Sequence, residues 1–93
     1  MNILVLQGLL QDAGIEVYSI FENNKASEVY VKTRFIQDDG FSWDTYVPFV
    51  DRRAGLDIKA EDELAAYLIS LKPYFTPQAM EKWKEDELAR GLI

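Results

Sequence analysis

The stretch SEVYVKTRFIQ, residues 27–37, decides the fold that the sequence predicts. Its side chains alternate in character, so that one face carries Val29, Val31, Thr33 and Phe35 and the other carries Tyr30, Lys32 and Arg34. Only Ile36 departs from this pattern. Because successive side chains of a β-strand point to opposite faces of the sheet, the alternation predicts a strand with one face in a core.

A further strand is expected on each side of this one. Residues 15–22, IEVYSIFE, are rich in the β-branched and aromatic side chains that favour strands. The turn Asn23-Asn24-Lys25 follows them, since asparagine tolerates a positive φ. Asp38-Asp39-Gly40 reads as a second hairpin turn. The pattern therefore predicts a three-stranded antiparallel meander.

The third strand is expected over residues 41–49, FSWDTYVPF. Its apolar face would consist of Phe41, Trp43, Val47 and Phe49. Pro48 lacks a backbone N–H, so the end of this strand is expected at a sheet edge or at a bulge. Residues 50–59 are interpreted as a connection.

Helices are expected before and after the meander. Residues 2–13 carry apolar side chains at helical spacing, and Gly14 follows as a left-handed stop. A second helix is expected over residues 60–71, with acids in its first turn and Pro73 after its end. A third would begin with Thr76 as N-cap and Pro77 in the first turn, carry Met80 and Trp83 inward, and end near Arg90.

The fold expected from these elements is a small α+β domain over residues 1–93 with the order α-β-β-β-α-α. The N-terminal helix and the two C-terminal helices would pack on the apolar face of the meander. The residues expected to be buried together are Val31, Phe35, Trp43, Leu68 and Trp83.

Two segments of the chain resemble each other, EDELAAYLI at residues 61–69 and EDELARGLI at residues 85–93. The match does not extend outward, and the first copy would open a helix while the second would close one. We interpret the likeness as helix-forming composition and not as a repeat. The second copy places acids in a last helical turn, so Leu92 and Ile93 should fray unless they dock.

Composition narrows the classes of function. The chain has 93 residues, a net charge of −6, no cysteine and no histidine, which removes thiol chemistry, the commonest general base and nearly all zinc sites. No cofactor is expected. The absence of disulfides, of a signal peptide and of a long apolar run favours a cytoplasmic protein without a membrane span. The acidic charge disfavours non-specific contact with nucleic acid and favours basic partners.

One short pattern touches metal-dependent nuclease chemistry. Asp51, followed by Asp57-Ile58-Lys59, imitates an arrangement in which two acids hold Mg²⁺ and a lysine polarises water. Matches of this size are common by chance, so the alternative is that Asp57 and Lys59 flank a helix start. No catalytic residue and no metal ligand is assigned.

The second face of the predicted sheet carries the candidate partner-binding residues, which are Tyr18, Tyr30, Lys32, Arg34, Tyr46, Arg52 and Arg53. Aromatic rings beside cations can stack on bases, and tyrosine and arginine are also enriched in protein interfaces. Glu16, Glu28 and Asp44 dilute the positive charge, which favours a protein partner. The alternatives are a face covered by helices or an ordinary solvated surface.

The sequence thus favours a non-catalytic, acidic protein-binding module. Such a module could be a small subunit, or an inhibitor from a phage or mobile element, that acts on a protein with a basic nucleic-acid-binding surface. The second hypothesis is a nucleic-acid-binding module that uses the aromatic and basic sheet face, and a metal-dependent nuclease fragment ranks third. The oligomeric state, including a homo-oligomer, is left open.

Overall fold

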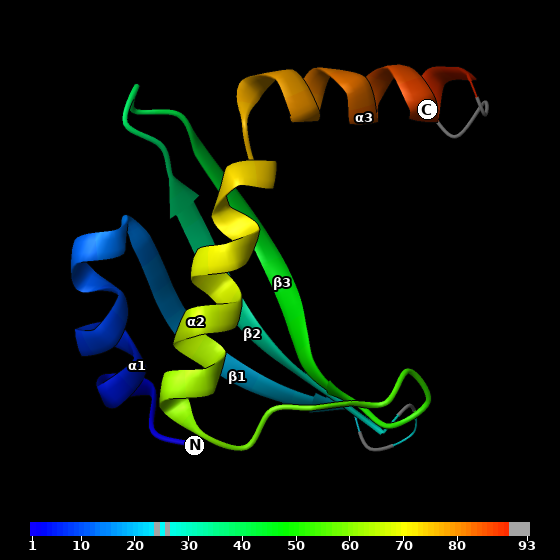
Figure 1. Cartoon of the computed structure of the whole chain (residues 1–93). Helices are drawn as coiled ribbons and strands as arrows, with labels where there is room; N and C mark the ends of the chain where they lie inside the picture. Colours follow the sequence, from blue (N-terminus) through cyan, green and yellow to red (C-terminus); the bar gives the residue numbers. More distant parts are fainter. Residues whose placement is uncertain (24, 26, 90–93) are drawn as a thin grey trace.

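The computed structural model describes residues 1–23, 25 and 27–89, without the side chains of residues 87–89. It shows a small α+β fold in which two helices lie on one face of an antiparallel sheet (Figure 1). The elements are α1 (Ile3–Leu10), η1 (Gln11–Ala13), β1 (Ile15–Asn23), β2 (Glu28–Ile36), β3 (Ser42–Asp51), β4 (Leu56–Asp57), α2 (Glu61–Leu71), η2 (Lys72–Tyr74) and α3 (Pro77–Ala89). The predicted order of helices and strands is confirmed, with one short strand added.

The N-terminal helix begins and ends where local chemistry requires it. The Asn2 side chain caps α1 by accepting hydrogen bonds from the backbone N–H groups of Leu4 and Val5, at 2.9 and 3.4 Å. Gly14 ends the following 3₁₀ turn with a φ of 69°. A Cβ at Gly14 would lie 2.7 Å from the Ile36 carbonyl oxygen, so both the conformation and the space demand glycine.

The sheet has the strand order β1-β2-β3-β4, and two β-bulges decide which side chains reach the core. Val17 lies opposite Thr33 and Ser19 opposite Lys32, so Tyr18 is an extra residue in β1. The extra residue reverses the alternation beyond it. Ile20 therefore packs against the core, whereas Phe21 remains exposed.

The second bulge lies in β3 beside Pro48. Val50 lies opposite Val29 and Pro48 opposite Tyr30, which leaves Phe49 as the extra residue. Phe49 is buried in the core. The edge or bulge predicted from Pro48 is therefore confirmed as a bulge.

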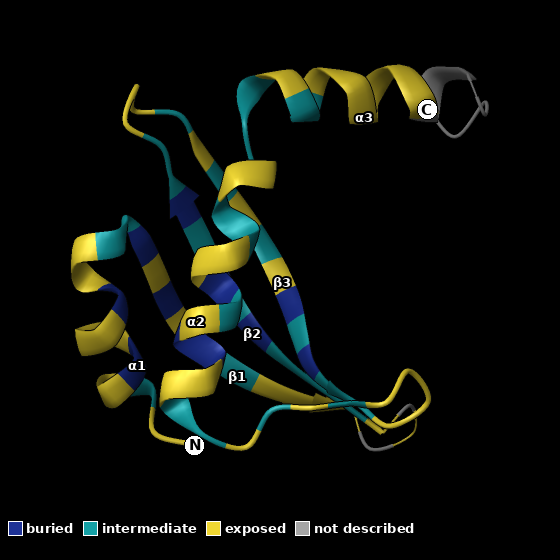
Figure 2. Cartoon of the chain, in the orientation of Figure 1, coloured by how far each residue is buried: buried dark blue, intermediate teal, exposed yellow. Residues whose placement is uncertain are grey.

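The core fills the space between the sheet and the helices α1 and α2. Its buried members are Leu6, Leu10, Ile15, Val17, Val31, Phe35, Val47, Phe49, Leu64, Ala65 and Leu68. Figure 2 shows this buried band along the sheet and along the facing sides of the two helices. Of the five residues predicted to be buried together, Val31, Phe35 and Leu68 are in the core, whereas Trp43 is only half-buried and Trp83 is exposed.

The prediction that α3 packs on the sheet is wrong. Figure 1 shows α3 projecting from the end of α2 and away from the sheet, and the Trp83 side chain is 52% exposed. The reason is that α1 and α2 already cover the apolar face, while Phe75 packs beside the half-buried Trp43, with ring centroids 5.1 Å apart. Thr76 does cap α3, through a 3.2 Å hydrogen bond from the Ala79 N–H to its hydroxyl.

Other predictions need correction or lie beyond the described residues. The expected connection 50–59 contains β4, because Leu56 and Asp57 pair with Asp51 and Val50. Residues 90–93, which include the expected helix end and the docking of Leu92 and Ile93, lie outside the described residues, as does position 24 of the predicted first turn.

Candidate functional site

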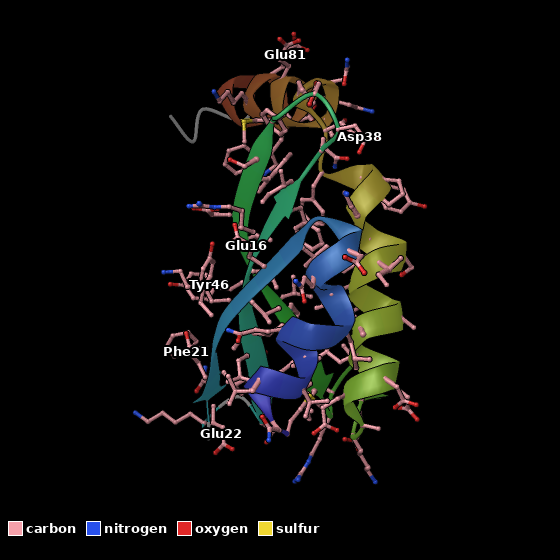
Figure 3. All side chains as sticks on the ribbon, turned by 90° about the vertical axis from the view of Figure 1, so that its left-hand side faces the viewer. Glu16, Phe21, Glu22, Asp38, Tyr46 and Glu81 are labelled. Carbon is pink, nitrogen blue, oxygen red and sulfur yellow. The ribbon has the colours of Figure 1, made fainter. Side chains whose placement is uncertain are left out.

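The candidate site is the face of the sheet that points away from α1 and α2, here called the outer face. Within the described residues no helix lies over it, and Figure 3 shows Phe21 and Tyr46 projecting from it on the side opposite the helices. It is formed by Glu16, Tyr18 and Phe21 of β1, Tyr30, Lys32 and Arg34 of β2, and Asp44, Tyr46 and Pro48 of β3.

Aromatic rings form the apolar part of the outer face. The rings of Phe21 and Tyr46 meet edge to face with centroids 5.7 Å apart, although the two residues come from different strands. They remain 45% and 57% exposed, so each ring offers area that a partner could bury. Tyr30 of β2 lies opposite Phe21 on β1 and Pro48 on β3, while Tyr46 lies opposite Lys32.

An ion pair neutralises the guanidinium of Arg34 on the outer face. The Arg34 Nε and Nη2 atoms donate to the two carboxylate oxygens of Asp44, at 2.6 and 3.0 Å. The hydrogen bond from Arg34 holds the pKa of Asp44 below its usual range, and the pKa of Arg34 is raised in turn. Both groups therefore stay charged, and their charges cancel.

Tyr18 lies beside this ion pair. The Arg34 guanidinium carbon lies 5.9 Å from the centroid of the Tyr18 ring, within the range of a cation–π contact. Partial burial and the neighbouring Glu16 carboxylate raise the pKa of the Tyr18 hydroxyl. Tyr18 is thus a neutral hydrogen-bond donor at physiological pH, on a face that combines rings, one balanced ion pair and hydroxyl groups.

The structure brings together the candidates Tyr18, Tyr30, Lys32, Arg34 and Tyr46 and sets the other two apart. Arg52 and Arg53 are exposed in the turn after β3, at the end of the sheet. Arg52 lines a hollow there of about 230 Å³ with Glu22, Glu28 and Ser27. Phe21 belongs to the outer face and was not predicted, because only the bulge at Tyr18 turns it to that side.

The residues of the nuclease-like pattern serve local structure instead. The Asp51 carboxylate accepts hydrogen bonds from the backbone N–H groups of Arg53 and Ala54, and it holds the turn. The Lys59 ammonium lies 3.4 Å from the Asp57 carboxylate. In the described part of the chain, no three acidic side chains gather in a group that could hold a metal ion.

No protein-family model matches the chain, and no curated protein or solved structure matches it either. Of the helices in the described ranges, none has the length and apolar character to cross a membrane. The outer face is therefore interpreted from its own geometry and chemistry.

Proposed function

We propose that the protein is a non-catalytic protein-binding module whose binding site is the outer face of the sheet. The observation that carries this proposal is the exposed ring pair of Phe21 and Tyr46 on a sheet face without a covering helix in the described residues. Two aromatic side chains with large exposed area are typical anchors of protein interfaces, where they are buried at the centre of the contact.

The charge of the outer face supports a protein partner over a nucleic acid. A phosphate-binding face needs cations that are free to replace counterions. Here Asp44 holds the guanidinium of Arg34 through both carboxylate oxygens, and Glu16 lies opposite Arg34 on β1. Among the described residues, Lys32 is thus the cation of this face whose charge is not balanced by a directly paired carboxylate.

The net charge of −6 favours a partner with a basic surface. We extend the proposal to a partner that handles nucleic acid, because such proteins expose basic grooves. An acidic module bound in such a groove would act as a small subunit of the partner. If it competes with the nucleic acid, it would act as an inhibitor, of the kind that a phage or mobile element would encode. This step rests on charge and size.

Affinity capture from cells with matched tyrosine variants tests the proposal. Tyr46 is 57% exposed on the outer face, whereas Tyr74 is 71% exposed in η2, away from that face. We expect a protein that is captured by the wild-type chain and by Tyr74→Ala but lost with Tyr46→Ala. A partner retained equally by both variants would place the binding site elsewhere.

A further inference from the structure

The strand β1 forms one outer edge of the sheet, since the strand order is β1-β2-β3-β4. An edge strand presents unpaired backbone groups to which an extended segment of another chain can pair. The opposite edge is obstructed, because Pro48 lacks an N–H and β4 already pairs with the end of β3. β1 contains no proline, so its edge is the better template.

The register shows which backbone groups of β1 face outward. The Ile36 N–H donates to the Gly14 carbonyl at 2.8 Å, so Gly14 points toward β2 and the alternation turns Ile15 and Val17 to the edge. The Gln7 amide of α1 already donates to the Val17 carbonyl at 3.0 Å. Beyond the bulge, the outward residues are Ile20 and Glu22, and the β1 residues that line the cleft beside α1 extend only to Tyr18.

A cleft of about 420 Å³ adjoins the first half of the edge, where α1 meets β1. Gly8 lines the cleft, and a Cβ at that position would meet no atom within 4 Å, so this part of the cleft is open space. The Nε2 atom of Gln7 donates to the Val17 carbonyl, which leaves the Gln7 Oε1 atom as an acceptor, and Glu16 and Gln11 also line the cleft. The cleft therefore offers oxygen acceptors and a negative charge, which suit a cationic side chain.

The charge of the edge has one sign. The charged residues of β1 are Glu16 and Glu22, and in the described part of the chain neither carboxylate takes part in a salt bridge. The register places Glu16 opposite Arg34 and Glu22 opposite Val29, so that the two side chains point to opposite faces of the sheet, and Figure 3 shows both acids well away from Asp38 and Glu81. A basic segment along this edge would meet complementary charge at both ends.

We propose that the edge of β1 at residues 19–22 pairs with an extended basic segment of the protein partner, and that an arginine or lysine of this segment enters the cleft between α1 and β1. This inference rests on the proposed function and specifies the partner's contact as an added β-strand. The backbone of Ile20 and Glu22 would form the pairing hydrogen bonds. The cleft would select the cation through Glu16 and Gln7.

Nuclear magnetic resonance titration tests the proposal with two capped peptides, TTVRVTRTT and TTVEVTETT, as probes. We expect the arginine peptide to shift the amide signals of Ile20 and Glu22 and the side-chain amide of Gln7, and the glutamate peptide to leave them unchanged. Glu16→Gln should weaken binding of the arginine peptide by about fivefold or more, and Glu81→Gln, which removes an exposed charge elsewhere, by less than about twofold. Equal effects of both peptides or of both substitutions, or no shifts at millimolar arginine peptide, would overturn the proposal.

Binding of the captured partner separates this inference from the proposed function. Glu22→Pro removes the outward N–H, and Glu22→Lys reverses the charge while keeping that N–H, so the second variant serves if the first unfolds. We expect each folded variant to lose at least about fivefold in affinity. Full affinity in these variants together with loss in Tyr46→Ala would refute the added strand and keep the outer face. Indifference to all three substitutions would refute both.

Discussion

Phe75 fixes the base of α3, and its removal gives the sharpest test of how the C-terminal part of the fold is held. Its ring stacks on Phe35 with centroids 4.3 Å apart and planes 10° apart, and it meets the edge of Trp43 at 5.1 Å. The side-chain amide of Gln37 also donates to the carbonyls of Phe75 and Lys72, at 2.7 and 2.8 Å. Phe75→Ala removes both ring contacts and leaves those hydrogen bonds.

The cost follows from the partial burial of Phe75. A fully buried phenylalanine replaced by alanine costs about 3–5 kcal/mol, and each aromatic pair contributes about 0.5–1.5 kcal/mol of such a total. Since Phe75 is half-buried, we expect Phe75→Ala to lower the free energy of unfolding by about 2–4 kcal/mol. The free energy of unfolding of a 93-residue chain is on the order of 5–14 kcal/mol. The variant should therefore still fold, but with a melting temperature roughly 10–30 °C lower.

Urea unfolding and thermal melting, followed by circular dichroism, measure the effect, with Trp83→Ala as the matched aromatic control. Trp83 is 52% exposed and takes part in none of the ring contacts among the described residues, so its loss should cost less than about 1 kcal/mol. Equal destabilisation by both substitutions would refute the placement of α3 away from the core.

Three further predictions concern acid stability and the competing functions. The Asn2 backbone N–H donates to the Glu61 carboxylate at 3.0 Å and lowers the Glu61 pKa, so this stabilisation is complete above the unfolded pKa of about 4.3 and is lost as the pH falls through the lower folded value. In the Glu61→Gln variant the melting temperature should therefore fall less steeply as the pH is lowered below that value. A pH dependence of the melting temperature equal to that of the wild type would contradict this prediction. In mobility-shift assays at low salt the protein should bind neither DNA nor RNA. Binding whose affinity falls steeply with added salt would favour the nucleic-acid hypothesis, in particular if Arg34→Ala reduces the slope of log affinity against log salt by about one phosphate contact. Plasmid DNA in Mg²⁺ should stay intact, and cleavage that disappears with Asp57→Ala would overturn the non-catalytic interpretation.

Much of the sheet could be predicted because β2 alternates cleanly. Residues 31, 33 and 35 carry buried side chains, as the period of two requires. The bulge at Tyr18 could not be predicted in the same way, because an extra residue leaves no mark in composition and its position depends on pairing with β2. For that reason Tyr46 was predicted on the outer face, whereas its ring partner Phe21 was not.

The placement of α3 shows a different limit of sequence reasoning. Apolar residues such as Met80 and Trp83 at helical spacing predict a helix with an apolar stripe, but they do not say whether a free surface remains for it. α1 and α2 occupy the apolar face of the sheet, and Phe75 fills the place beside Trp43. β4 escaped prediction because a strand of two residues has no measurable alternation.

The most direct test of the outer face as a protein-binding site is the dissociation constant of the captured partner, measured by isothermal titration calorimetry. The chain variants to compare are Tyr46→Ala and Tyr74→Ala, which remove the same side chain from two exposed positions. The proposal predicts a loss of more than about 1 kcal/mol, or roughly fivefold in affinity, for Tyr46→Ala and less than twofold for Tyr74→Ala. Equal affinities of the two variants for the partner would contradict it.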